Sequence, residues 1–113
     1  MQRSETAVDS SIKSLDNILN EGKKLVLLGG DHSTSLGYIK ALGEKYKDFG
    51  ILQIDAHCDL RQAYEGFTYS HASVMYNALQ LDHVKSLTQV GIRDFCEDEL
   101  DYAKSSNKKI NIF

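Results

Sequence analysis

Short apolar runs alternate along the chain with longer stretches in which apolar residues recur at helical spacing. The apolar runs predict strands over residues 25–28, 49–54, 84–90 and 109–113. The periodic stretches predict helices over about residues 5–20, 34–46, 70–81 and 96–105. The first run is apolar throughout, so its strand is expected to be buried on both faces. Helices that alternate with short strands indicate an α/β fold, a parallel sheet with flanking helices.

Polar motifs follow three of the predicted strands, at the point where each strand ends. Residues 29–32 read Gly-Gly-Asp-His, residues 55–59 read Asp-Ala-His-Cys-Asp, and residues 91–94 read Gly-Ile-Arg-Asp. In open parallel sheets the ligand site lies beyond the carboxyl ends of the strands. The sequence therefore predicts one site at that edge of the sheet, built from these three segments.

The segment 55–59 carries a potential metal ligand at every second position: Asp55, His57 and Asp59. On extended backbone, alternate side chains point to the same face, so these three groups are expected to converge. Two carboxylates and one imidazole suit a hard or borderline divalent ion such as Mn²⁺. The alternative is a polar turn after a strand. Cys58 alternates to the opposite face, where we expect it to pack in the core.

Two further histidines are candidates for the same site. His32 follows a glycine pair that permits a tight turn, and it is expected to point toward the same edge as Asp55. His71 lies twelve residues beyond Asp59 at the start of a predicted helix, where it could act as a proton donor or shuttle. The alternatives are a surface residue beside a helix cap for His32 and an exposed residue in a capping turn for His71. His83 has no motif around it and is predicted to face solvent.

Composition limits the class of protein. The chain has 113 residues, which fits one domain at most, with 42% apolar and 26% charged residues, as in soluble globular proteins. The net charge is −3, and no dense run of lysine and arginine suggests binding to nucleic acid or a membrane. The N-terminal residues lack the apolar core of a signal peptide. We therefore predict a cytoplasmic protein in which both cysteines, Cys58 and Cys96, are reduced thiols.

Three motifs in order carry a family resemblance: Gly-Gly-Asp-His-Ser at 29–33, Asp-Ala-His-x-Asp at 55–59 and Ser-His at 70–71. Together they resemble the ureohydrolases, the family of arginases and agmatinases, over about residues 8–113. The resemblance implies a three-layer fold around a parallel sheet. It also implies two Mn²⁺ ions and the hydrolysis of a guanidinium compound to urea and an amine.

The resemblance also assigns roles to individual residues. His32 and Asp59 would be ligands of one Mn²⁺, His57 would bind the other, and Asp55 would contribute to both. A hydroxide shared by the ions would attack the guanidinium carbon, and His71 would assist proton transfer or substrate placement. Asp55 and His71 are thus the predicted catalytic residues.

Departures from the arginases favour agmatine as the substrate. Arginases typically place an asparagine where this chain has Arg61, and an aspartate that holds the substrate's α-amino group where it has Cys96. The stretch around Arg61 and Ser70-His71-Ala72 resembles agmatinases instead. The partner is thus predicted to be a small guanidinium compound such as agmatine. The alternatives are another ureohydrolase (arginase, guanidinobutyrase or formimidoylglutamase type) and a non-catalytic metal-binding or assembly module.

One family feature is missing from the sequence. The family completes its metal site with a later Ser-x-Asp-x-Asp segment, and no such segment occurs here. The family also has further strands before and after this region. We therefore expect residues 1–113 to be a partial ureohydrolase domain, truncated at both ends, whose activity in isolation is doubtful. The full-length protein is expected to be a homo-oligomer.

Overall fold

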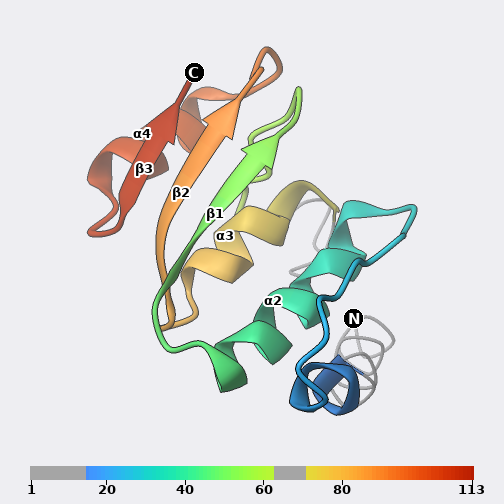
Figure 1. Cartoon of the computed structure of the whole chain (residues 1–113). Coiled ribbons are helices and arrows are strands. Elements are labelled where there is room, and N and C mark those ends of the chain that lie inside the picture. The colour runs from blue at the N-terminus through green and yellow to red at the C-terminus, as the bar shows by residue number, and fades with distance from the viewer. Residues whose placement is uncertain (1–14, 63–70) are drawn as a thin grey trace.

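The computed structural model describes residues 15–62 and 71–113, which form a parallel sheet with helices packed against it (Figure 1). The strands are β1 (Phe49–Ile54), β2 (Val84–Val90) and β3 (Lys109–Ile112), in that spatial order. Both neighbouring pairs are parallel. The predicted α/β class and parallel sheet are therefore confirmed.

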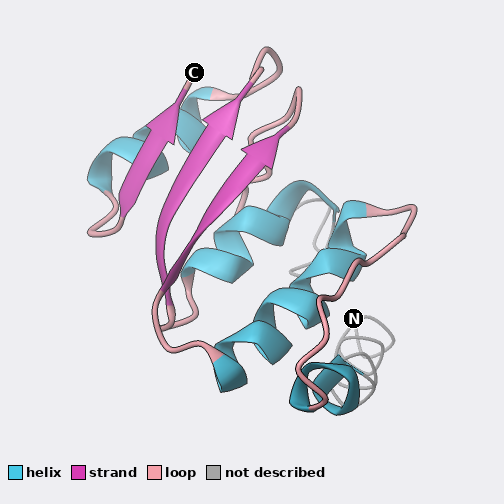
Figure 2. Cartoon of the chain, viewed as in Figure 1, coloured by secondary structure: helices cyan, strands magenta, loops and turns pink. Residues whose placement is uncertain are grey.

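Helical segments precede each strand in the described parts of the chain (Figure 2). A 3₁₀ turn, η1 (His32–Thr34), leads into α2 (Ser35–Lys45), and a second, η2 (His71–Ser73), leads into α3 (Val74–Leu79). Helix α4 (Glu97–Ser105) lies between β2 and β3, and residues 15–20 are also helical. These bounds agree with the predicted helices to within a few residues, although residues 5–14 of the first lie outside the described residues.

The core lies on one face of the sheet. Strand register aligns Ile51, Leu87 and Ile110, so their side chains share that face. Helices α2, α3 and α4 all contribute apolar side chains to the cluster formed there, including Leu36, Val74 and Tyr102. The alternate positions face the other way, and among them Leu52 and Ile54 are 66% and 80% exposed. The described residues thus cover only one face of β1.

The prediction of a strand at residues 25–28 is wrong. Residues 23–29 are neither helix nor strand, and Val26 and Leu28 are 87% and 96% exposed rather than buried. The segment runs beside α2, where the Tyr38 hydroxyl donates a hydrogen bond to the Leu25 carbonyl (Figure 1). A strand requires a neighbour that pairs with its backbone N–H and C=O groups, and no described strand pairs with this segment.

His83 was predicted to face solvent, but it is half-buried beneath α2. Its ring packs against Gly43, where any Cβ would collide with it, and lies 5.2 Å from the Phe49 ring. The ring Nε2 is 3.2 Å from the Ile39 carbonyl oxygen. The glycine is therefore required where the helix approaches the loop before β2. Separately, none of the helices in the described ranges is long and apolar enough to cross a membrane.

One-sided packing predicts that two leucines on adjacent strands differ in their contribution to stability. Leu87 is fully buried and Leu52 is 66% exposed. Leu87→Ala should lower the free energy of unfolding by about 2–5 kcal/mol, or abolish the folding transition. Leu52→Ala should change it by less than about 0.5 kcal/mol. Urea unfolding of the 113-residue chain measures both, and equal losses would contradict the one-sided core.

Candidate metal centre

The candidate site lies at the carboxyl edge of the sheet, where the segments after β1 and β2 meet. The backbone N–H groups of Arg93 and Asp94 both donate to the Ala56 carbonyl, at 2.9 and 3.0 Å. Gly91 allows this approach because its φ is 90° and a Cβ there would lie 3.3 Å from the Asp55 carbonyl oxygen. The turn after β2 therefore holds the start of the 55–59 segment in place.

A left-handed residue then redirects the chain. Asp59 has φ 54°, a conformation that few residues other than glycine, asparagine and aspartate adopt readily. Its carbonyl accepts hydrogen bonds from the Met75 and Tyr76 N–H groups at the start of α3, both at 3.0 Å. The next N–H group, that of Leu60, donates to the buried Glu99 carboxylate at 3.0 Å. The backbone of Asp59 thus secures the helix, and its carboxylate remains available to the site.

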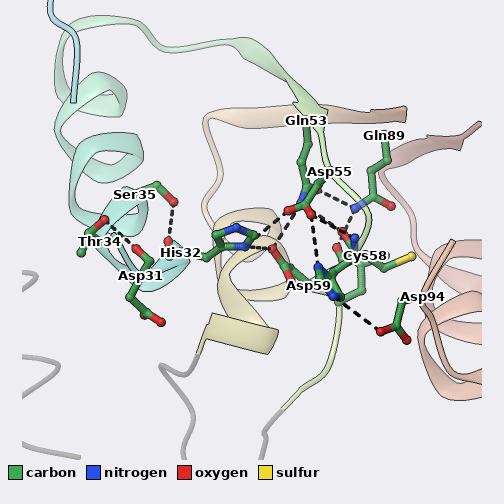
Figure 3. Close-up of polar contacts among 12 residues, drawn as sticks. Asp31, His32, Thr34, Ser35, Gln53, Asp55, Cys58, Asp59, Gln89 and Asp94 are labelled. Atoms are coloured by element: carbon green, nitrogen blue, oxygen red, sulfur yellow. Dashed lines mark hydrogen bonds and ion pairs between the residues drawn. The ribbon is translucent and has the colours of Figure 1, made fainter. Parts of the chain in front are cut away.

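Three predicted ligands come together at this edge (Figure 3). His32 Nδ1 lies 2.7 Å from Asp59 Oδ2 and 3.3 Å from Asp55 Oδ2. One candidate ligand atom from each of these residues lies within 4.8 Å of the others, a grouping that could hold a metal ion. Two carboxylate oxygens and an imidazole nitrogen fit Mn²⁺ and similar divalent ions.

His57 lies on the other side of Asp55. Its Nδ1 is 3.3 Å from Asp55 Oδ1, and its backbone N–H donates to the same oxygen at 3.0 Å. Its Nε2 lies 3.5 Å from an Asp94 carboxylate oxygen. Asp55 and Asp59 come together as expected, but not through extended backbone, because the chain bends at residues 55 and 56 and Asp59 is left-handed. For His71 only the backbone, in η2, is described, so its predicted role stays a prediction.

The pKa values of His32, Asp55 and Asp59 are shifted because these side chains lie close together. The hydrogen bond to Asp59 raises the pKa of His32 above its ordinary value, and the nearby negative charges of Asp59 and Asp55 add to the effect. Burial raises the pKa of Asp59, which the hydrogen bond with His32 offsets only in part. Burial alone would also raise the pKa of Asp55, but hydrogen bonds from His57 and Gln53, with the charge of His32, lower it overall. Both shifts favour binding of a proton at His32 and Asp59 in the metal-free chain.

Sequence reasoning missed three buried polar residues beside the cluster: Gln53, Gln89 and Glu99. Two of them carry a signal in the sequence. Gln53 lies two residues after Ile51, and Gln89 two residues after Leu87. Residues two apart in a strand share a face, so each glutamine occupies a core-facing position. Glu99 was harder to recognise, because it completes a capping box whose first residue is Cys96 rather than serine or threonine.

A cavity of about 400 Å³ adjoins the cluster. His32, His57 and Asp59 line it on the side of the candidate ligands, and Arg61, Asp94 and Glu99 line it elsewhere. Three of these six side chains are carboxylates. The cavity thus combines the candidate metal ligands with further acidic groups that suit a cationic compound.

Comparison with known proteins gives the family. A family model described as the arginase family matches residues 1–113, the whole chain. The chain belongs to the arginase family. An agmatinase of Bacillus subtilis is 35% identical over 109 residues, which are 96% of this chain and 38% of that protein. An N(1)-aminopropylagmatine ureohydrolase of Thermus thermophilus is 43% identical over 86 residues, 76% of this chain and 29% of that protein.

The solved structures agree with this membership. An arginase from Medicago truncatula superposes on this arginase-family chain with a TM-score of 0.85 at 32% identity. The match covers 93% of this chain and 34% of the other. The chain thus spans about a third of the length of the relatives it matches. The resemblance drawn from the three motifs is confirmed at the level of family and fold.

The left-handed conformation of Asp59 predicts different effects for two substitutions that both remove its charge. Asparagine tolerates φ 54°, whereas alanine does so only with strain. Asp59→Ala should therefore lower the free energy of unfolding of the metal-free chain by about 1–2 kcal/mol more than Asp59→Asn. Urea unfolding of the two variants measures the difference. Equal stability would mean that the turn is not held in this conformation.

Proposed function

We propose that the full-length protein is a Mn²⁺-dependent ureohydrolase of the agmatinase type, which hydrolyses a small guanidinium compound to urea and an amine. The observation that carries the proposal is the cluster of His32, Asp55 and Asp59 at the carboxyl edge of the sheet. Family membership supports the reaction class, and the names of relatives such as the B. subtilis agmatinase support the substrate.

Individual residues of the chain have separate roles in the proposed reaction. His32, Asp55 and Asp59 would hold an ion, and His57, on the other carboxylate oxygen of Asp55, would hold a second. Bound divalent ions lower the pKa of water, so that hydroxide is available near neutral pH. His71 would move a proton between the site and the leaving amine. Asp55 is central because its two oxygens face different histidines, Oδ2 toward His32 and Oδ1 toward His57.

The acidic groups of the cavity support a substrate with a second positive charge. Glu99 and Asp94 line the cavity together with the candidate ligands. Glu99 is already held by Arg61 at 3.9 Å and by the Leu60 and Cys96 N–H groups, so the exposed Asp94 carboxylate is the group that a substrate's amine would meet. Agmatine carries a guanidinium and an amine and no carboxylate, which suits this lining better than arginine does. Homo-oligomer formation and a cytoplasmic location remain predictions.

The substrate is tested by urea release from the full-length protein loaded with Mn²⁺. Agmatine should be hydrolysed with a higher kcat/KM than arginine, because the cavity lining favours a second cation over a carboxylate. N(1)-aminopropylagmatine is the third substrate to compare, given the T. thermophilus relative. A preference for arginine would contradict the substrate proposal. Absence of urea release from all three would contradict the ureohydrolase proposal.

Matched carboxylate variants test the metal role. Asp55→Ala should lower kcat/KM on the order of 10³-fold, because a ligand that faces both histidines is lost. Asp101→Ala removes an exposed carboxylate on α4 and should leave kcat/KM unchanged. Bound Mn²⁺ should fall in parallel with activity in Asp55→Ala. Full activity or full Mn²⁺ content in that variant would refute the proposed ligand set.

The raised pKa of His32 predicts opposite pH dependences for the metal-free and Mn²⁺-bound chain. A group with a raised folded pKa contributes stability below its unfolded value, near pH 6.5, and that stability is lost as pH rises through the folded pKa. Mn²⁺ requires the deprotonated imidazole, so its affinity should rise over the same range. Melting curves from pH 6 to 9, with and without Mn²⁺, should diverge as pH rises. Parallel curves would show that His32 is not a ligand.

A further inference from the structure

Two buried glutamines lie directly behind the ligand cluster. Gln53 and Gln89 are paired across β1 and β2 on the face that the helices cover. They are 8% and 0% exposed. Gln89 Nε2 donates a hydrogen bond to Gln53 Oε1 at 2.7 Å. Amides buried in an apolar core are destabilising unless they are hydrogen-bonded, so this pair is held by specific contacts.

The far end of the pair contacts the candidate ligands (Figure 3). Gln53 Nε2 lies 3.0 Å from Asp55 Oδ2 and 3.2 Å from Asp59 Oδ2. These are the same two oxygens that face His32 Nδ1, at 3.3 and 2.7 Å. The amide also donates to the His57 carbonyl at 3.2 Å. Gln53 therefore contacts both carboxylates at the oxygens that would bind an ion.

The direction of the amides is determined by their neighbours. Gln89 Nε2 also donates to the Cys58 carbonyl at 2.6 Å, so both of its contacts are acceptors. Reversing the Gln89 amide would set its oxygen against two other oxygens. In the observed orientation, Gln89 Oε1 is buried and, among the described residues, has no hydrogen-bond partner. The two acceptors, on Gln53 and Cys58, therefore fix the orientation of the Gln89 amide.

We propose that Gln53 is a positioning residue for the ligand carboxylates of Asp55 and Asp59, and that Gln89 fixes the direction of the Gln53 amide. This inference rests on the proposed function, in which those oxygens bind Mn²⁺. With its oxygen held by Gln89, the Gln53 amide can only donate to the carboxylates, which orders their Oδ2 atoms before an ion arrives. Ligands that are already ordered bind an ion more tightly.

Mn²⁺ titrations of the full-length protein test whether Gln89 acts through Gln53. Gln53→Met should weaken Mn²⁺ binding about 10–100-fold, the usual effect of losing a group that orients a ligand. Gln89→Met should weaken it less. The double variant should be no weaker than Gln53→Met, because Gln89 acts through Gln53. Gln80→Met is the matched control and should bind Mn²⁺ as tightly as the wild type. Gln80 is exposed, and its amide contacts Tyr76 and Tyr102.

Unfolding and NMR measurements separate positioning from a structural role. Affinities are compared after correction for the folded fraction, which urea unfolding supplies for each variant. In the metal-free wild type, the two Gln53 side-chain N–H resonances should be dispersed and slow to exchange. In Gln89→Met they should move toward the values of a free glutamine. Unchanged Mn²⁺ affinity in folded Gln53→Met, or additive losses in the double variant, would overturn the inference.

The two proposals can fail separately. A wild-type full-length protein that binds no Mn²⁺ contradicts the proposed function. In that case the Gln53 resonances alone decide the inference: dispersed and Gln89-dependent signals support the fixed amide direction, and averaged signals overturn it.

Discussion

The site depends on the parallel hydrogen bonding between β1 and β2, which continues past the ends of both strands. The Asp55 N–H donates to the Val90 carbonyl at 3.0 Å, and the Ala56 carbonyl then accepts from the turn after β2. Because the strands are parallel, the polar segments that follow them emerge at the same edge. Without this pairing, the carboxylates of residues 55–59 would have no fixed place relative to His32, which reaches the edge from η1.

Assembling the ligands works against the stability of the metal-free chain. Asp59 is buried in a left-handed conformation, and its carboxylate lies beside that of Asp55. The buried Oε1 of Gln89 also has no hydrogen-bond partner among the described residues. Such unfavourable features persist only where the surroundings hold them, and they gather at functional sites. Here the Met75 and Tyr76 N–H groups of α3 donate hydrogen bonds to the Asp59 carbonyl. The Glu99 carboxylate accepts a hydrogen bond from the N–H group of Leu60, the next residue.

The sequence was sufficient for the strands that pair with the next strand along the chain. The bounds of β1 and β2 were predicted from apolar runs, and the burial of Cys58 from its position between ligands. The run at 25–28 is more uniformly apolar than either, yet it forms no strand, because strand formation also needs a neighbour that composition does not reveal. Convergence of the ligands was predicted for the wrong reason: the turn at Asp59, with φ 54°, brings them together. Asp59 gave no local sign of that conformation.

Core packing and ligand orientation are coupled through the register of the strands. Gln53 and Gln89 face the helices for the same reason as Ile51 and Leu87, since each glutamine lies two positions further along its strand. A slip of one residue in either strand would turn its glutamine to the opposite face and separate the two amides. It would also shift the donors that hold the start of the 55–59 segment. The apolar positions that fix the register therefore also orient the carboxylates, and a core mutation that loosens the register is expected to disturb the site without touching it.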